Sequence, residues 1–282
     1  MAMLYLRPPV AAGRYYELDP VNLRKQIDAA FAKFGKSRKK VDKVRAAIVP
    51  HAGYDYSGWV AASVYSILDR KEKINFVIFG TNHYMIGSKY ATMKSGLWKT
   101  PLGGVSVDEK MTDSIIERSK IIEIDVLPHQ NEHSIEIQLP MLQYVFGNDF
   151  KFVPITVSTD IMDNSAVDDI RIIGKAVADA VKSSKEKWVV LASSDFSHYV
   201  PQKLAEDTDK YLISPILKLN ESSFLERVVE KNASACGIGA VAAAIVAAKA
   251  LGSKKGRLMK YATSADLSGD KSSVVGYAGI IM

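Results

Sequence analysis

Residues 44–58 read VRAAIVPHAGYDYSG, and this stretch carries the pattern from which the fold is inferred. Its first six residues are apolar except for Arg45 and rich in β-branched side chains, which is typical of a strand buried on both faces. His51 and two glycines follow, and residues 59–68 then have helical spacing. A buried strand, a turn with a polar side chain and a helix together predict one unit of an α/β fold.

The same alternation continues to the end of the chain. Further strands are predicted at 74–79, 150–157, 188–192, 258–263 and 274–281. Further helices are predicted at 237–251 and around Ile170, Ile173, Val177 and Val181, which share one helical face. We therefore expect an α/β sandwich in which helices flank a central, mostly parallel or mixed sheet. Residues 95–106 and 266–273 are predicted to be ordinary loops, and the absence of a flexible linker predicts that residues 1–282 form a single domain.

Length and composition exclude several classes of protein. Of the 282 residues, 48% are hydrophobic and 24% are charged, so the chain can form a large core and is not disordered throughout. No stretch approaches the ~18–20 apolar residues of a membrane span, and the N-terminus lacks the pattern of a signal peptide, so no membrane association is expected. The single cysteine, Cys236, cannot form an internal disulfide and favours a reducing, cytoplasmic location.

The basic residues do not predict a nucleic-acid partner. The net charge of +6 comes from 37 basic and 31 acidic residues, most of them scattered along the chain. One dense basic cluster covers 36–40 and continues with Lys43 and Arg45, and we interpret it as a solvated loop before the first buried strand. No alternation of arginine and aromatic residues marks a surface on which bases could stack.

Histidines follow three of the predicted strands. His51 follows the first strand, His83 ends the segment INFVIFGTNH, and His198 ends WVVLASSDFSH. Ligands of open α/β folds bind outside the carboxyl ends of the strands, so these three imidazoles are expected to meet in one site. His133 is expected to open a helix in NEHSIEIQLPML, whereas His129 is interpreted as a loop residue.

These residue types suit a metal centre. Neutral imidazole is the commonest metal ligand and also the usual general base near neutral pH. A catalytic metal has about three protein ligands and an open position, and Cys236 is the candidate third ligand because a predicted helix N-terminus would favour its thiolate. Asp195, three residues before His198, could orient that imidazole. Glu132 and His133 could serve the site or simply cap the helix that they precede.

Seven segments of the chain resemble the Memo family, whose archaeal and bacterial members are also called AmmeMemoRadiSam system protein B. The segments are RPPVAAGRYY, VPHAGYDYSG, GTNHY, NEHSIEIQLPML, SSDFSHY, SACG and VVGYAGIIM. They span nearly the whole chain and keep the order of the family. The resemblance implies the fold of the catalytic subunit of class III extradiol ring-cleaving dioxygenases.

The resemblance also implies a set of metal ligands. Memo-like proteins hold their metal with two histidines and a cysteine, and the motifs place these at His51, His83 and Cys236. The ring-cleaving dioxygenases have a carboxylate where this chain has a cysteine, so assigning their activity from the fold would be analogy alone. Thiolate is a softer ligand than carboxylate and favours copper(I), zinc or iron–sulfur chemistry. The expected cofactor is iron or copper, with zinc as a further option.

Four further residues are implied to be catalytic. The motif SDFSH places the additional acid and histidine of the family at Asp195 and His198. The motif EHS places Glu132 and His133 beside them. In this interpretation His198 is the general base and Asp195 orients it.

These features predict a metal-dependent redox enzyme that acts on small molecules, including aromatic ones. Tyr54, Tyr56 and Tyr84 neighbour the ligand motifs and could either line the pocket or be ordinary half-buried aromatics. One alternative is a binding or scaffold module without turnover, since animal Memo-like proteins are linked to phosphopeptide binding. Another is a hydrolase with Cys236 as nucleophile and His198 as base. The alternative family name implies association with a radical-SAM protein and an AMMECR-type protein.

Overall fold

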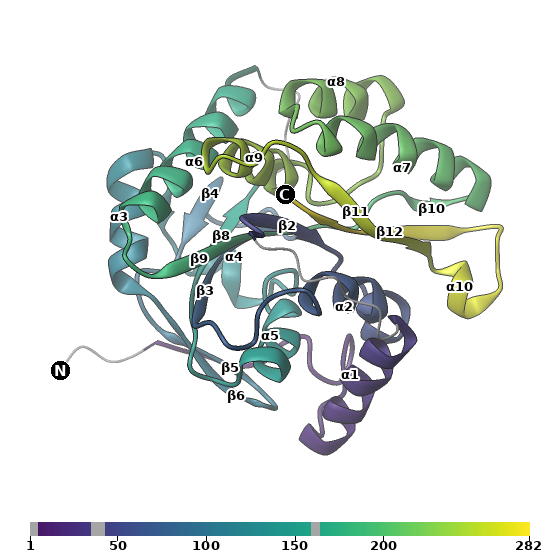
Figure 1. Cartoon of the computed structure of the whole chain (residues 1–282), viewed down its shortest axis with the longest axis horizontal. Helices are drawn as coiled ribbons and strands as arrows, with labels where there is room; N and C mark the ends of the chain where they lie inside the picture. The colour runs from purple at the N-terminus through teal and green to yellow at the C-terminus, as the bar shows by residue number, and fades with distance from the viewer. Residues whose placement is uncertain (1–4, 35–42, 159–163) are drawn as a thin grey trace.

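The computed structural model describes residues 5–34, 43–158 and 164–282 (Figure 1). Residues 36–40 of the basic cluster lie outside these ranges, so their interpretation as a solvated loop stays a prediction. The strands are β1 (Leu6–Arg7), β2 (Ala46–Val49), β3 (Ile74–Thr81), β4 (Tyr90–Thr92), β5 (Leu97–Thr100), β6 (Gly103–Val107), β7 (Glu123–Ile124), β8 (Lys151–Val157), β9 (Lys187–Ser193), β10 (His198–Val200), β11 (Arg257–Thr263) and β12 (Val274–Ile281). The helices are α1 (Pro20–Phe34), the π-helix η1 (Tyr54–Gly58), α2 (Trp59–Tyr65), α3 (Glu109–Ser119), α4 (Leu127–Gln130), α5 (Gln138–Phe146), α6 (Asn164–Ser183), α7 (Gln202–Leu217), α8 (Glu221–Lys231), α9 (Ile238–Ala250) and α10 (Ala265–Ser268).

The strands of the described residues form one mixed sheet, whose main path has the order β1-β5-β6-β8-β3-β9-β2-β12-β10. Outside this path, β11 pairs with β12, and β4 pairs with β7 and β8. Its centre is parallel, because β8, β3, β9 and β2 all run in the same direction. Antiparallel pairs flank this centre: β12 pairs with β2 on one side, and β5 pairs with β6 on the other. The predicted α/β architecture with a mostly parallel or mixed sheet is therefore confirmed.

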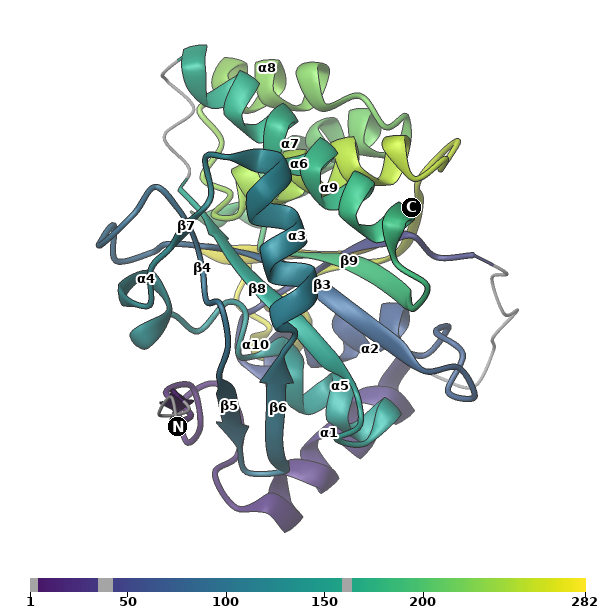
Figure 2. The same cartoon turned by 90° about the vertical axis from the view of Figure 1, so that its left-hand side faces the viewer.

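Two layers of helices cover the sheet. Figure 1 shows α1, α2 and α5 below the strands and α6, α8 and α9 above them, and Figure 2 shows α3 lying in front of β8. In β2, Ala47 and Val49 pack into the core that includes α1, α2 and α5, whereas Ala46 and Ile48 pack into the core that includes α3 and α6–α9. Burial of both faces explains why the central strands are continuous apolar runs in the sequence.

Helix α9 is held closely against α6 and the sheet. Ten of its 13 residues are buried, and most of these are alanine. A Cβ atom on Gly174 of α6 would lie 2.6 Å from the carbonyl oxygen of Ala243, so only glycine at this position allows the two backbones to approach this closely. This packing fixes the start of α9 beside the carboxyl ends of β8 and β9. Neither α9 nor any other helix in the described part of the chain is long and apolar enough to cross a membrane.

Three local predictions were wrong. Residues 95–106 contain the hairpin β5–β6 rather than an ordinary loop, because the fully buried Trp98 anchors β5 in the sheet. The predicted loop 266–273 begins within the short helix α10. The helix expected to open at His133 begins only at Gln138, and the intervening residues form turns that hold the side chains of the site described below.

Candidate metal centre

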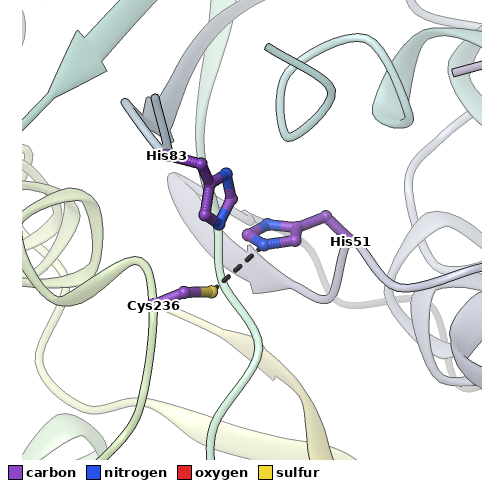
Figure 3. Close-up of side chains that lie close together, drawn as sticks. All are labelled: His51, His83 and Cys236. Atoms are coloured by element: carbon purple, nitrogen blue, oxygen red, sulfur yellow. Dashed lines mark hydrogen bonds between the residues drawn. The ribbon is translucent and has the colours of Figure 1, made fainter. Parts of the chain in front are cut away.

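Three side chains meet at the carboxyl edge of the parallel strands. His51 follows β2, His83 follows β3, and Cys236 precedes α9 (Figure 3). Strand β9 lies between β3 and β2, so the two histidines approach each other across its end. The structure thus brings these residues together where ligands of open α/β sheets bind.

The donor atoms of the three side chains have a spacing that suits one metal ion. One ligand atom from each residue lies within 4.8 Å of the other two. The Sγ atom of Cys236 lies 3.1 Å from Nε2 of His51, and the two imidazoles meet edge to face with their centroids 5.3 Å apart (Figure 3). Ligand bonds of about 2.0–2.3 Å separate tetrahedral donors by roughly 3.3–3.6 Å, so small movements would let one ion contact all three.

Hydrogen bonds leave Nε2 of His51 available as a ligand. Its Nδ1 lies 3.1 Å from Oγ of Ser193. That hydroxyl donates its proton to the carbonyl oxygen of Ser134 at 2.6 Å and accepts a hydrogen bond from Nε2 of Gln138 at 2.8 Å. The hydroxyl can therefore only accept from His51, so Nδ1 carries the proton and the lone pair of Nε2 faces Cys236. Burial lowers the pKa of His51 to about 3, which keeps the ring neutral.

A buried carboxylate holds His83 in the same way. The carboxylate of Glu132 accepts from Nδ1 of His83 at 2.9 Å and from the backbone N–H of His83 at 2.9 Å. Burial raises the pKa of Glu132, but the hydrogen bond from His83 and the charges of His83 and His133 outweigh this effect and lower the pKa to about 2. With the proton held on Nδ1, Nε2 of His83 is free for a metal, an arrangement common around metal ligands. Glu132 contacts His83 of the candidate site, and the alternative that it caps a helix fails because α5 begins only at Gln138.

The state of Cys236 differs from the expectation. Burial raises the pKa of its thiol well above the ordinary value, and the neighbouring carboxylate of Asp195 adds to the effect. The prediction that the helix N-terminus would favour a thiolate is therefore wrong for the protein without a bound cation. The amide of Asp195 donates to Sγ at 3.3 Å, which directs the sulfur toward His51. A metal ion would have to displace the thiol proton.

His198 is oriented by Ser234 rather than by Asp195. Its Nδ1 lies 2.8 Å from the carbonyl oxygen of Ser234, which can only accept a hydrogen bond, so Nδ1 carries the proton. The buried carboxylate of Asp195 instead accepts from the backbone N–H of His51 at 2.8 Å. Asp195 thus positions the loop that carries His51, and the expected contact between Asp195 and the His198 ring is replaced by the one to Ser234.

A cavity of about 780 Å³ opens above the candidate metal centre. The other chemically active residues that line it are His133, Asp195 and His198. The ring of Tyr15 stacks on His133 at a centroid distance of 4.3 Å, and His133 stacks on His83 at 4.8 Å. The cavity therefore gathers all four imidazoles of the predicted site in one concave space.

Most of the tyrosines that line the cavity differ from those that the sequence indicated as possible lining residues. Tyr56 lines the cavity as considered, but Tyr54 is buried with its hydroxyl donating to the carbonyl of Ile137, and Tyr84 is exposed outside it. The other lining tyrosines are Tyr15, Tyr199 and Tyr277. Tyr15 and Tyr277 lie in the segments RPPVAAGRYY and VVGYAGIIM, which pointed to the family but gave no sign of proximity to the histidines.

His129 is a core residue and not a loop residue. It lies in α4, is 1% exposed, and packs edge-on against Trp98 with the ring centroids 5.8 Å apart. Burial lowers its pKa to about 3, with a further contribution from Arg7. It does not line the cavity above the metal centre.

A buried ion pair fastens the N-terminal segment beneath this site. Arg7 and Glu136 are both 0% exposed, and Nη1 of Arg7 lies 2.5 Å from Oε2 of Glu136. Arg7 also donates to the backbone carbonyls of His129 and Glu132, at 2.7 and 2.6 Å. Glu136 accepts further from the Tyr16 hydroxyl at 2.6 Å. The pair therefore holds the segment that carries Glu132 against the N-terminal strand.

Fold and site define an α/β protein with a candidate metal centre of two histidines and one cysteine. Residues 7–281 match the family model described as Memo-like protein, and the chain therefore belongs to the Memo family. It is 40% identical to a MEMO1 family protein of Methanopyrus kandleri, over 98% of each chain. It is 44% identical to a MEMO1 family protein of Methanococcoides burtonii, over 98% of this chain and 100% of that one.

The fold is also similar to that of a solved structure. This is the crystal structure of an uncharacterized protein from Escherichia coli K12, with a TM-score of 0.51 and 13% sequence identity. The likeness covers 85% of this chain and 100% of the other. At this identity it shows the shared fold alone.

Proposed function

We propose that this protein is a metal-dependent redox enzyme in which His51, His83 and Cys236 hold iron or copper. The observation that carries the proposal is the meeting of three ligand atoms within 4.8 Å of one another at the floor of an open cavity. Both imidazoles present an unprotonated Nε2, because Ser193 and Glu132 hold the protons on Nδ1. A mixed nitrogen and sulfur set suits copper, iron or zinc better than magnesium or calcium.

The surrounding residues would prepare the site for a small molecule. A bound iron or copper would supply redox chemistry and Lewis acidity, and zinc would supply Lewis acidity alone. His198 would act as the general base, because Ser234 holds a proton on Nδ1 and Nε2 is left to accept one from a substrate. Glu132 and Asp195 position His83 and His51, and His133, which stacks on both Tyr15 and His83, forms part of the cavity wall.

Metal content is the first test. Protein purified without oxygen should contain about one iron or copper per chain, and Cys236→Ala should lower metal affinity by well over the roughly 10–100-fold typical of losing a residue that only orients a ligand. His129→Leu is the matched control, because it removes a buried imidazole outside the cavity and should leave metal content unchanged. Full metal retention in Cys236→Ala would defeat the ligand assignment.

Two further variants separate binding from chemistry. His198→Ala should retain the metal but lose turnover in an assay of catechols under oxygen, and metal loss in this variant would refute its role as a base. Cys236→Asp should shift the metal preference from copper(I) toward iron, because a hard oxygen replaces a soft sulfur. An absence of turnover with every catechol, in protein that holds its metal, would instead favour the binding module.

A hydrolase is less well supported by the contacts. The expected base His198 is held by Ser234, and the imidazole that contacts Sγ of Cys236 is that of His51. Burial also raises the pKa of the thiol, which disfavours a nucleophile. A small-molecule substrate, and association with a radical-SAM protein and an AMMECR-type protein, stay predictions.

A further inference from the structure

A second hollow, of about 620 Å³, lies between α7 and β11, and we call it the α7–β11 groove (Figure 1). None of its lining residues lines the cavity above the candidate metal centre. Helix α7 contributes Ile213 and Leu217, and β11 contributes Leu258 and Tyr261. The hydroxyl of Tyr261 donates to the buried carboxylate of Asp209 at 2.8 Å, so its polar atom is satisfied within the protein. The walls of the groove are therefore mainly apolar.

The α7–β11 groove follows one face of α7. Its lining residues on this helix run from Glu206 to Leu217, with Lys210, Ile213 and Ser214 between them. Glu206 and Leu217 are eleven residues apart, and at a rise of 1.5 Å per residue this is about 16 Å. A partner helix that presents apolar residues at i, i+3, i+4 and i+7 covers about 10 Å with them. The groove is therefore long enough for two turns of an amphipathic helix.

Exposed basic residues surround the end of the groove that lies at the last turn of α7. Lys218 lines this end, and Lys210 lies two turns earlier. The N–H of Gly256 donates to the carbonyl oxygen of Leu217 at 2.9 Å, which places a further basic segment beside them. This segment contains Lys254, Lys255 and Arg257. All five basic side chains are exposed, and none of them forms an ion pair within the part of the chain that the structure describes.

Few acidic groups balance these charges. Among the described residues that line the groove, Glu206 alone is a carboxylate, and its Oε1 accepts from Nε2 of Gln202 at 2.7 Å. Asp207, the next residue of α7, already pairs with Lys203. The rim of the groove therefore has an excess of positive charge, and it is electrostatically complementary to an acidic partner.

An added β-strand fits this surface less well than a helix. Among the described residues, β11 pairs only with β12, so its outer edge is open to another strand. However, the register of β11 shifts between Leu258 and Lys260, and the N–H of Thr263 already donates to the carboxylate of Asp266 at 2.8 Å. Irregular edges with basic side chains disfavour the addition of a strand.

A second copy of the chain and a membrane surface also fit less well. In a symmetric dimer through the groove, the same basic residues of both copies would lie close together, which is unfavourable. A flat, anionic lipid surface would meet the basic rim but not the apolar floor, where Ile213 is buried. The hollow shape and the apolar walls therefore favour a segment that inserts side chains.

We propose that the α7–β11 groove binds an amphipathic helix of a partner protein that has apolar residues on one face and acidic residues beside them. The apolar side chains of the partner would cover Leu217 and Leu258, and its carboxylates would pair with the exposed lysines of the rim. The inference does not depend on the proposed redox function, because the groove shares no lining residue with the cavity above the metal centre.

The test uses a fluorescently labelled helical peptide of about 15 residues, with leucine at i, i+3, i+4 and i+7 and glutamate beside this stripe. Fluorescence anisotropy with the whole chain should show saturable binding that weakens as the salt concentration rises. Three control peptides have lysine in place of glutamate, serine in place of leucine, or a central proline that breaks the helix. Each should bind at least about tenfold more weakly. No saturable binding of the acidic peptide, or equal binding of any control peptide, would overturn the inference.

Variants of exposed leucines locate the binding surface. Leu258→Ser changes a wall of the groove at a residue that is 37% exposed, and it should weaken binding of the acidic peptide by about tenfold. Leu204→Ser is the matched control, because Leu204 is a 54% exposed residue of α7 outside the groove, and binding should not change. Unchanged binding in Leu258→Ser would overturn the inference.

A double variant tests the contribution of the basic rim. Lys210→Gln combined with Lys218→Gln should weaken binding of the acidic peptide severalfold and reduce its dependence on salt. Lys99→Gln, at an exposed residue of β5 outside the groove, should change neither quantity. An unchanged salt dependence in the double variant would contradict the role of the rim.

Two further measurements distinguish the other occupants. Vesicles of phosphatidylcholine and phosphatidylglycerol should not compete with the acidic peptide, and sedimentation velocity should show no self-association that Leu258→Ser abolishes. Competition by the vesicles, or a dimer that dissociates in Leu258→Ser, would assign the groove to a membrane or to a second copy and overturn the inference.

Discussion

Two buried carboxylates lie four residues apart on one segment and serve different purposes. Glu132 and Glu136 are both 0% exposed. Glu136 pairs with Arg7, whose guanidinium is always charged, and also accepts from the Tyr16 hydroxyl. Glu132 pairs with the imidazole of His83, whose other nitrogen faces the candidate metal centre.

The difference shows how the same residue type builds either scaffold or site. A buried carboxylate with a permanent cation as its partner has a fixed charge balance, and it fastens two segments of the chain together. A buried carboxylate with an imidazole as its partner fixes the position of a proton, and so determines which nitrogen can bind a metal. Removing Glu136 or its partner should therefore cost stability, whereas removing Glu132 should cost metal affinity.

The largest effect is expected at the scaffold pair. Arg7→Met leaves the buried carboxylate of Glu136 without its cation, and we expect the free energy of unfolding to fall by about 3–5 kcal/mol. Urea denaturation measures this loss, while the folded fraction should still bind metal. Arg14→Met, at an exposed arginine nearby, is the control and should change stability by less than about 0.5 kcal/mol. Equal stability of the two variants would remove the distinction between the carboxylates.

A smaller effect, on metal affinity, is expected at the site carboxylate. Glu132→Gln should weaken metal binding by about 10–100-fold, because the amide no longer holds the His83 ring as strongly. Titration with a competing chelator measures the affinity, and Glu117→Gln on the exposed side of α3 serves as the control. The comparison fails if Glu132→Gln lowers stability as much as Arg7→Met while leaving metal affinity unchanged.

The pH dependence of stability separates a core imidazole from these carboxylates. The pKa of His129 is about 3 in the folded protein, below its ordinary value of 6.5, so the unfolded chain binds more protons between these values. Stability should therefore fall as the pH falls through this window, and His129→Leu should make the dependence shallower by about 1.4 kcal/mol per pH unit. Denaturation of metal-free protein at several pH values measures both slopes. An identical slope in the variant would show that His129 is not buried as a neutral ring.

The sequence predicted the fold because its central strands are buried on both faces. Continuous apolar runs such as those of β3 and β9 have few interpretations other than strands buried on both faces. Strand β12 was predicted with the bounds that the structure has. The hairpin β5–β6 was missed because Trp98 lies in a segment that also contains Gly96, Pro101, Gly103 and Gly104, and such residues are typical of a loop.

Only those features of the site that depend on local sequence were predicted. His51, His83 and His198 follow strands, so topology alone brought them to one edge. The partners of these residues come from distant segments: Ser193 contacts His51 across 142 residues, and Ser234 contacts His198 across 36. Such pairs leave no local pattern, which is why Asp195 was given a role that belongs to Ser234.

The most direct test of the central claim is X-ray absorption at the metal edge of protein purified without oxygen. If His51, His83 and Cys236 hold the metal, the spectrum will contain one sulfur at about 2.3 Å and imidazole nitrogens at about 2.0–2.1 Å. The sulfur will disappear in Cys236→Ser. A bound metal surrounded only by nitrogen and oxygen in the unaltered protein, or a sulfur that persists in Cys236→Ser, would contradict the account.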